Sequence, residues 1–348
     1  MARIVYAASG EGYGHAVRVH SVGACLLARG HDVRFFSCHK TQVYLRPLFG
    51  DRVHEVFGLS LTYREGTAKP VSTVFHNLRR AWADLGSTLG RLLRLLRSFK
   101  PDLVITDFEP FTAMWARRFG IPYISLDNQH LLTHCHVDRP AGFLRDVINA
   151  YLTIRFYNCG AQRYLIPTFI RAAIRFHPAT LLDPILRPTV YNKSIGRGDF
   201  LLAYKGAEGE NEAMRRVLEA YRRKPIRAYG FEVSGRRGGV TYKATTTEGF
   251  LDDLAECAGV IMSAGHSLAS ECLHLEKPML LVPITRQFEQ TVNAHYLEKM
   301  GAGRRVDRLS ISAIDEFIDQ LETYRSAIAN IPKAKLDGVM EAIEREIP

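Results

Sequence analysis

Several common signals are missing from this chain of 348 residues. Its six cysteines are scattered without a CxxC pair, which argues against a disulfide framework or a zinc site and is typical of reduced thiols. No apolar run approaches the roughly 20 residues of a transmembrane helix. The first residues, MARIVYAASG, have neither the charged lead nor the apolar core of a signal peptide. These absences predict a cytoplasmic protein that does not span a membrane.

Two signatures of enzyme chemistry are missing as well. The chain has no GxSxG motif, so the nucleophile of a serine hydrolase is not indicated. The stretch SGEGYGH at 9–15 has GxGxG spacing, whereas a dinucleotide site needs GxGxxG, and the next strand ends at Ser37 without an acid for a ribose. Gly12 and Gly14 therefore indicate a loop that a ligand approaches closely.

The chain is rich in apolar sequence and in positive charge. Its hydrophobic fraction of 47% suffices for the cores of two domains of ordinary size. The net charge of +10 favours an anionic partner, which a membrane surface, a nucleic acid or a phosphorylated substrate would provide.

Apolar strands and helices alternate along the chain, which predicts an α/β fold of parallel sheets with crossover helices. Pro178, Pro184 and Pro188 interrupt the alternation, so we expect a linker at 177–190. The alternation then restarts, which predicts domains at 1–183 and 184–310, followed by a helical segment at 311–348. Two such halves predict a cleft, and open α/β sheets bind ligands at the carboxyl ends of their strands.

Two polar residues of the first half are expected at such strand ends. His15 follows the glycine loop after the first strand, and Asp107 follows the apolar strand LVIT. An aspartate behind a histidine orients the ring and stabilises the imidazolium, so the pair would act as a general base on a substrate hydroxyl. Alternatively, Asp107 caps the helix that begins near Pro110 and His15 bonds only to backbone. Glu109 is a weaker substitute for Asp107.

The second half contains the most informative stretch, at 259–303. An apolar strand leads into a turn and a helix, where Gly265, His266 and Ser267 would offer free N–H groups to a diphosphate. Glu271, further along that helix, suits a ribose diol, and the pair Glu289-Gln290 suits sugar hydroxyls. In this order, the residues indicate a site for a nucleotide-activated sugar. The alternatives are an ordinary strand–helix corner and solvated helix acids.

The segment with His130, His134, Cys135 and His136 suggests a metal ion at first sight. Its spacing matches no zinc pattern, and no CxxC pair supports it. We therefore expect polar loop or cleft-lining residues there and no metal site.

Two stretches that are expected to be helical indicate what kind of partner the protein binds. Residues 75–99 have apolar side chains at helical spacing, with arginines mostly off that stripe. They form either a surface helix with a solvated basic face or a contact with anionic lipid, to which each charge adds about 1 kcal/mol. Residues 142–164 are aromatic and basic and would suit an apolar acceptor, although they fit a helix that packs inward equally well. Binding of nucleic acid is supported by charge alone.

The stretch at 250–303 resembles the nucleotide-sugar glycosyltransferases of the GT-B fold. It is similar to the family 28 enzymes, which include the N-acetylglucosaminyltransferase that makes lipid II, and to family 1, whose signature ends in an acid–Gln pair. SGEGYGHAVR and ITDFEPF match the group's base loop and the aspartate that supports the base. The resemblance covers nearly the whole chain. It implies an acceptor-binding and a donor-binding domain, both Rossmann-like and doubly wound, with the C-terminal helix packing back toward the first.

The resemblance further implies an inverting, metal-independent transfer from a nucleoside diphosphate sugar, most often UDP-linked, to a hydroxyl acceptor, with no cofactor. Ser263 stands where related enzymes have a histidine or an arginine, so a diphosphate contact is expected from Lys205 instead. The residues carried over by position are His15 and Asp107 as base and partner, Gly12 and Gly14 in the acceptor loop, Gly265, His266 and Ser267 at the diphosphate, Glu271 and Phe250 at the nucleoside, and Glu289 and Gln290 at the donor sugar.

Rival interpretations stay open at this point. A non-hydrolysing UDP-sugar epimerase would share the fold and the donor site, and a non-catalytic protein would bind the nucleotide sugar only. The acceptor is either lipid-linked and met at the cytoplasmic face of a membrane, which implies peripheral contact with anionic lipid, or an apolar aglycone.

Overall fold

A computed structural model describes residues 1–10, 12–56, 63–64, 67–68, 90, 92–138, 144–157, 160–205, 211–244, 247–285 and 287–348. The expected basic helix at 75–99 lies mostly outside these residues, and only its helical residues 90 and 92–99 are placed. There Leu92 and Leu96 are buried, and the guanidinium of Arg97 lies over the ring of Phe119.

The first half is built on a sheet of seven parallel strands, whose central members are buried on both faces. Ile4 and Tyr6 of the first strand lie on one face, and Val5 and Ala7 lie on the other. Apolar strands of this kind need helices on both faces of the sheet. In sheet order the strands are β3 (Val53–Glu55), β2 (Asp32–Ser37), β1 (Arg3–Ala8), β6 (Leu103–Asp107), β7 (Tyr123–Leu126), β8 (Arg163–Pro167) and β9 (Ala179–Leu182).

Helices cover both faces of this sheet, and short elements lie in the connections between strands and helices. On one face lie α1 (Tyr13–Ala28) and α2 (His39–Phe49). On the other lie α4 (Pro110–Arg118), α5 (Leu131–His134) and α6 (Leu144–Tyr157). The connecting elements include η1 (Gly50–Arg52), η2 (Pro188–Val190) and the hairpin of β4 (Tyr63–Arg64) and β5 (Thr67–Ala68).

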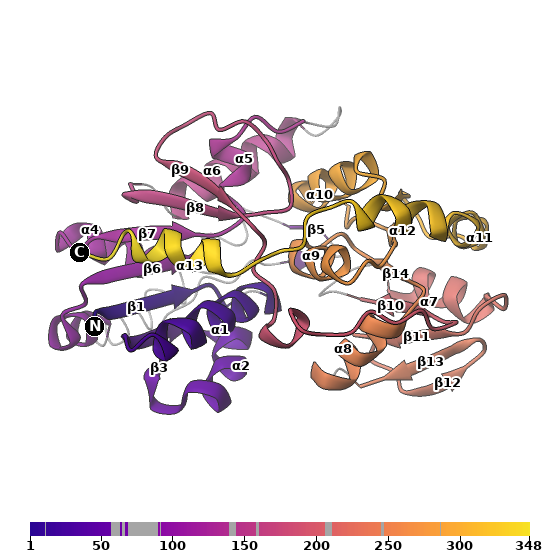
Figure 1. Ribbon diagram of the computed structural model, residues 1–348, viewed down its shortest axis with the longest axis horizontal. Helices are drawn as coiled ribbons and strands as arrows, with labels where there is room; N and C mark the ends of the chain where they lie inside the picture. Colours follow the sequence, from indigo (N-terminus) through magenta and orange to yellow (C-terminus); the bar gives the residue numbers. More distant parts are fainter. Residues whose placement is uncertain are drawn as a thin grey trace.

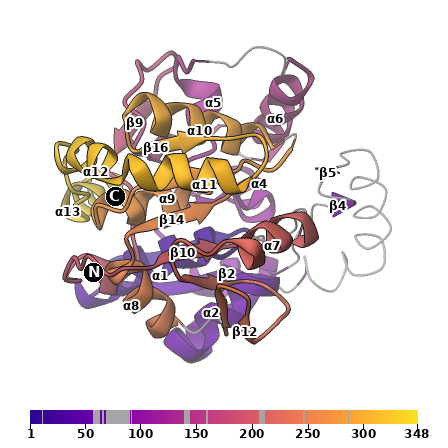
Figure 2. The same cartoon turned by 90° about the vertical axis from the view of Figure 1, so that its right-hand side faces the viewer.

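The second half repeats this plan with another seven-stranded sheet, in which only the edge pair β12–β13 is antiparallel. In sheet order the strands are β12 (Gly235–Arg237), β13 (Val240–Lys243), β11 (Ile226–Tyr229), β10 (Leu201–Tyr204), β14 (Gly259–Met262), β15 (Met279–Leu281) and β16 (Gly303–Arg305). One face holds α8 (Thr247–Glu256), α9 (His266–His274) and α10 (Phe288–Lys299). The other holds α7 (Asn211–Ala220), α11 (Ile311–Asp319) and α12 (Leu321–Ala329). In Figure 2 this half faces the viewer.

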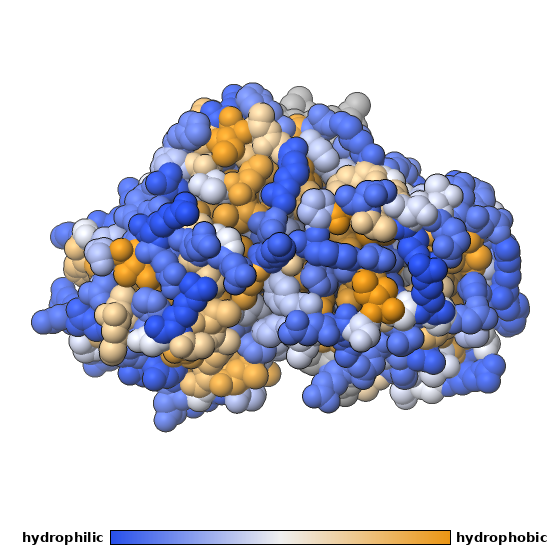
Figure 3. Space-filling model, in the orientation of Figure 1, coloured by the Kyte–Doolittle hydropathy of each residue, from blue (hydrophilic) through white to orange (hydrophobic). Residues whose placement is uncertain are grey.

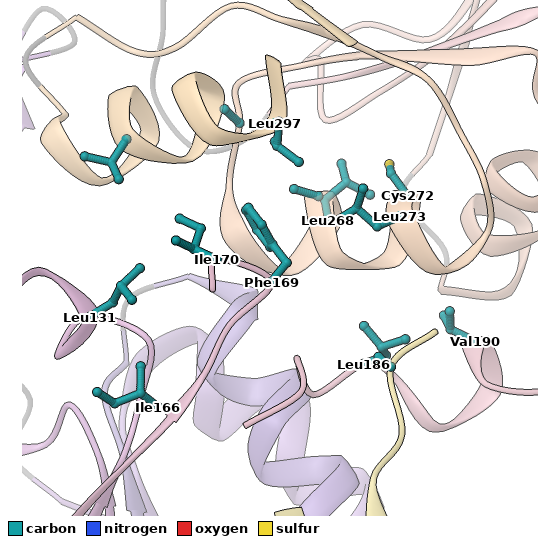
Figure 4. Packing of buried hydrophobic residues seen from close by; sticks show 14 of the residues in the cluster. Leu131, Ile166, Phe169, Ile170, Leu186, Val190, Leu268, Cys272, Leu273 and Leu297 are labelled. Carbon is teal, nitrogen blue, oxygen red and sulfur yellow. The ribbon is translucent and has the colours of Figure 1, made fainter. Parts of the chain in front are cut away.

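The two halves lie side by side and share one apolar cluster (Figure 1). Phe169 and Ile170, from the segment between β8 and β9, extend toward Leu268 of α9 and Leu297 of α10 (Figure 4). The carboxyl ends of the strands in the two seven-stranded sheets therefore face each other across this contact. The predicted site residues are expected to meet there.

The last helix, α13 (Asp337–Glu344), returns to the first half and lies along its sheet (Figure 1). Val339, Met340 and Ile343 are buried with Ile4 of β1 and Leu26 of α1. The C-terminal helix thus packs against the N-terminal domain, as the resemblance implied. This arrangement ties the two halves together a second time, independently of the linker.

The proline-rich passage differs from its prediction. Ala179–Leu182 forms β9, a regular edge strand that pairs with β8 inside the expected linker at 177–190. Proline is tolerated next to an edge strand because one side of that strand makes no ladder hydrogen bonds. The passage from Asp183 to the start of β10 at Leu201 connects the two sheets, and the predicted domain boundaries stay predictions.

Polar side chains cover most of the face in Figure 3, and a notch separates the two halves at its lower edge. A depression of about 390 Å³ lies beside Tyr13 at the start of α1 and is also lined by His39 and Val43 of α2. Among the described residues, no helix combines the length and the apolar character that crossing a membrane requires.

Candidate active site

His15 and Asp107 meet at the carboxyl edge of the first sheet. β1 and β6 are parallel neighbours, and their register sets Asp107 beside the end of β1, where α1 begins. Nδ1 of His15 lies 2.8 Å from Oδ1 of Asp107, and both side chains are buried. The cap of α4 is Glu109, whose carboxylate accepts hydrogen bonds from the backbone of Phe111 and Thr112. The capping alternative for Asp107 is therefore wrong.

Arg18 completes this cluster and was missed in the sequence analysis. Its Nε and Nη2 atoms donate to the two oxygens of Asp107 at 2.8 and 2.7 Å, and 4% of its side chain is exposed. Burial alone disfavours the charged guanidinium, but the charge and hydrogen bonds of Asp107 outweigh it and raise the pKa of Arg18. The spacing of three residues from His15 puts both on one side of α1. That spacing does not distinguish a buried arginine from a surface one.

The surroundings of His15 assign its proton. Nη2 of Arg18 lies 2.9 Å from the same Nδ1 atom that faces Asp107, but it already donates to Oδ1 of Asp107 at 2.7 Å, so the contact between Nδ1 and Oδ1 still needs a proton of its own. A proton on Nδ1 gives the carboxylate its donor, whereas a bare Nδ1 would set a lone pair against the carboxylate oxygen. We therefore assign Nδ1–H to the neutral ring, which leaves Nε2 as the basic atom.

A chain of hydrogen bonds links this cluster to the second half. Nη1 of Arg18 donates to Oδ1 of Asn128, just after β7, at 3.1 Å. Nδ2 of Asn128 then donates to Oε1 of Glu289 in α10 at 2.8 Å. The predicted base and the residue expected at the donor sugar are thereby joined through two side chains that the sequence analysis did not select.

Two helix N-termini meet at the cleft. α1 begins after Gly12 and α9 begins after Gly265. In the part of the chain that the structure describes, neither helix has a side-chain cap or an acid in its first turn. A Cβ atom added to Gly14 would lie 2.7 Å from Oγ of Ser267, so the two first turns are in contact. Uncapped N–H groups and both helix dipoles favour an anion at this place.

His266 packs beside these turns against the first half. Its ring stacks on that of Phe169, with the centroids 5.0 Å apart, and the residue is buried. Burial and the charge of Arg18 lower the pKa of His266 to about 3. The ring is therefore neutral near pH 7, so any contribution of His266 to anion binding would come from its backbone N–H.

Glu271 is paired with a second arginine that the sequence analysis missed. Arg187, in the connection between the sheets, donates from Nε and Nη2 to the two carboxylate oxygens at 2.8 Å each. Only 1% of the Glu271 side chain is exposed. The same guanidinium lies 5.2 Å from the centre of the Phe250 ring. Both residues expected at the nucleoside thus contact Arg187, and a ribose at Glu271 would have to share the carboxylate with it.

The remaining donor residues surround the turn before α9. Oε1 of Gln290 accepts a hydrogen bond from the backbone of Ile284 at 3.0 Å and so shapes the loop after β15. Nδ2 of Asn293 donates to the carbonyl oxygen of Ala264 at 3.1 Å, which supports the turn itself. Lys205 directly follows β10 at the carboxyl edge of the sheet. The contacts of Gln290 and Lys205 with a donor stay predictions.

The histidine segment supports the loop that carries Asn128. Nδ1 of His130 lies 2.8 Å from Oδ1 of Asp127, and both side chains are buried. The rings of His130 and His134 pack on Tyr164, with centroid distances of 4.6 and 4.1 Å. Within the described ranges, no group of three or more His, Cys, Asp or Glu side chains is arranged to hold a metal.

The contact at Gly14 gives a first prediction. Gly14→Val should lower the rate of the expected sugar transfer on the order of 10²-fold, because its branched side chain would push the two first turns apart and misplace the reacting groups by about an ångström. Gly14→Ala is the matched control, since Oγ of Ser267 lies at the end of a side chain that can rotate away from one methyl group. The measurements are the transfer rate and the melting temperature. Equal activity of both variants would show that this contact does not matter for transfer.

Comparisons with known proteins identify the family of the chain. The family model described as "Glycosyl transferase family 1" matches residues 2–322. An uncharacterized glycosyltransferase of Methanosarcina acetivorans is 26% identical in an alignment of 376 positions that covers 97% of this chain and 97% of that protein. The UDP-N-acetylglucosamine–N-acetylmuramyl-(pentapeptide) pyrophosphoryl-undecaprenol N-acetylglucosamine transferase 3 of Bacillus cereus is 31% identical in an alignment of 104 positions that covers 27% of this chain and 29% of that protein.

A solved structure extends the likeness to the whole fold. A UDP-glucosyltransferase of Polygonum tinctorium capable of glucosylating indoxyl, in complex with 3,4-dichloroaniline, superposes with a TM-score of 0.69 at 12% identity, covering 99% of this chain and 98% of that one. The two facing α/β halves are therefore those of the GT-B fold. Because the family model covers most of the sequence, the chain belongs to glycosyl transferase family 1 and is a glycosyltransferase.

Proposed function

We propose that the protein moves a sugar from a nucleoside diphosphate sugar, with UDP as the favoured nucleotide, to a hydroxyl acceptor, with inversion and without a metal ion. The observation that carries this proposal is the meeting of two uncapped helix N-termini beside a buried His15–Asp107 pair. Such N-termini suit a diphosphate, and such a pair suits an acceptor hydroxyl.

In the proposed reaction, Nε2 of His15 takes the proton of the acceptor hydroxyl while its oxygen attacks the anomeric carbon. The bond from that carbon to the diphosphate oxygen breaks, and its electron pair leaves with the nucleoside diphosphate. Attack opposite the leaving group inverts the anomeric configuration. Asp107 stabilises the imidazolium that forms on His15.

The second half would hold the donor. The N–H groups of the turn at 265–267 would meet the charge that grows on the leaving diphosphate, in the role that a metal ion has in other enzymes. Lys205 would add a positive charge, Glu271 and Phe250 would contact the nucleoside, and Glu289 with Gln290 would contact the sugar. Contact between the halves would exclude water from the activated donor.

Two kinds of acceptor are compatible with this site, a lipid-linked compound and a small apolar molecule. The names of two relatives each support one of them. The Bacillus cereus protein is named for a pyrophosphoryl-undecaprenol compound, and the Polygonum tinctorium enzyme for indoxyl. Ile148 and Leu152, one turn apart on α6, are 49% and 60% exposed and would suit an apolar acceptor or a bilayer surface. We place the reaction in the cytoplasm, with a lipid-linked acceptor met at the inner face of the membrane.

A thermal-shift screen of nucleoside diphosphates and their sugars tests the donor. A ligand present at 100 times its Kd stabilises the folded state by about 2.7 kcal/mol, so UDP and one UDP-sugar should raise the melting temperature clearly. The shift should persist in a chelator, and the anomeric proton of the product should report inversion by NMR. If no nucleotide of any base raises the melting temperature, the proposed donor site is wrong. A shift that vanishes in chelator would contradict the metal-independent mechanism.

A further inference from the structure

Arg18, Asn128 and Glu289 form a row of hydrogen bonds across the two halves. The Arg18–Asn128 bond is 3.1 Å long and the Asn128–Glu289 bond is 2.8 Å long. Arg18 and Asn128 are buried, at 3% and 5% exposure. At its other end, Arg18 holds both oxygens of Asp107. One buried guanidinium is thus in contact with the partner of the base and with the residue that reaches Glu289.

The hydrogen-bonding capacity of the three side chains determines which atoms donate and which accept in this row. A guanidinium can only donate hydrogen bonds, and an ionised carboxylate can only accept them. An amide does both, so Asn128 must turn Oδ1 to Arg18 and Nδ2 to Glu289. An aspartate at this position would accept from Arg18 but set its own charge against Glu289. An alanine would remove the hydrogen-bond partner of Nη1 of the buried Arg18 and of Oε1 of the partly buried Glu289.

The neighbouring groups keep Asn128 available for this role. The adjacent Asp127 is held by His130, whose Nδ1 and backbone N–H both lie within 3.0 Å of Oδ1. Asp127 therefore does not compete for Arg18. Asn128 binds Oε1 of Glu289, which leaves Oε2 to accept a hydrogen bond from a sugar hydroxyl.

We propose that Arg18 and Asn128 are positioning residues that hold Asp107 and Glu289 in one closed arrangement, so that activation of the acceptor and binding of the donor sugar depend on each other. This inference rests on the proposed function. Arg18 fixes the carboxylate behind the base, and the same side chain orients the amide that holds Glu289. The row is broken when the halves separate, because its last bond crosses between them.

A pair of isosteric changes tests the row. Asn128→Asp should raise the donor KM at least tenfold, since it places two carboxylates within hydrogen-bonding distance. Glu289→Gln alone should also weaken donor binding. In the double variant the amide of residue 289 can donate to the carboxylate of residue 128, so each hydrogen bond of the row again joins a donor to an acceptor. Its donor KM should therefore be at least tenfold lower than the product of the two single effects predicts.

Arg18→Lys tests the other end of the row. A single ammonium group cannot form the fork that grips Asp107 and reach Asn128 as well. The variant should therefore lower kcat and raise the donor KM together. Arg325→Lys is the matched control, because Arg325 is also a buried arginine but bonds to Glu322 and the carbonyl of Ala258 within the second half. It should leave both constants unchanged.

Hydrogen exchange of the free protein gives a readout that needs no donor. Peptides covering 125–131 and 287–293 should exchange faster in Asn128→Asp and return toward wild type in the double variant. Additive KM effects, or exchange that neither single change alters, would overturn the inference. If the wild-type protein binds no nucleotide sugar, the proposed function fails, while the exchange rates still decide whether the row holds the two halves together.

Discussion

Replacing His15 by alanine is expected to lower kcat for sugar transfer by about 10²–10⁴-fold, the usual contribution of a general base. Nucleotide binding should be nearly unchanged, because Nε2 of His15 is proposed to contact the acceptor and the donor contacts are predicted in the second half. Asp107→Asn should also lower kcat strongly, since an amide in place of the carboxylate disturbs both the proton on Nδ1 and the grip of Arg18. The measurements are kcat with saturating donor and the nucleotide Kd by calorimetry.

His20→Ala is the control for this experiment. His20 lies on the same helix, is partly buried and bonds through Nδ1 to the hydroxyl of Tyr44 at 3.1 Å, away from the His15–Asp107 pair. Its loss should affect stability but not the chemical step. Transfer at a near wild-type rate in His15→Ala would remove the base assignment, whereas a loss of nucleotide binding would place His15 at the donor instead.

The second large effect is expected at Glu271. Glu271→Ala leaves the guanidinium of Arg187 largely buried without its partner, which should lower the free energy of unfolding by about 3–5 kcal/mol. It should also weaken nucleotide binding, because the proposed ribose contact is lost. Glu271→Gln separates the two effects, since an amide keeps the shape and one acceptor for Arg187 but binds a ribose diol less well. Chemical denaturation measures the first effect and calorimetry the second.

Glu212→Ala is the control for the ion pair. Glu212 pairs with Arg216 on the exposed surface of α7, where such pairs contribute little to stability. Unchanged stability of Glu271→Ala would mean that the buried pair is not formed in solution. Unchanged nucleotide affinity of Glu271→Gln would refute the ribose role while leaving the structural role intact.

Much of the fold could be predicted from the sequence because its signals are local. Buried parallel strands are continuous apolar runs, and the alternation with helices leaves few arrangements open. The position of a residue at a strand end is also a local property, so His15 and Asp107 could be selected before their contact was seen. The structure sets them 2.8 Å apart because β1 and β6 are neighbours in the sheet.

The partners of these residues could not be predicted in the same way. Arg18, Asn128 and Arg187 carry no distinctive local motif, and most arginines in such a sequence lie on the surface. Their roles come from which groups surround them: Arg18 is buried against Asp107, and Arg187 against Glu271. The strand β9 was missed for a related reason, since pairing with β8 outweighs the local effect of the prolines.

The sequence by itself therefore determined the two α/β halves, the strand ends and the residue types that face the cleft. Only the tertiary structure decided that Glu109 rather than Asp107 caps α4, and that Asn128 joins Glu289 across the halves. The physical reason is that apolar periodicity and chain direction depend only on residues that are close together in the sequence. Whether a buried charge is stable, by contrast, depends on neighbours far away in the sequence, as for Arg18 and Asp107, which are 89 positions apart.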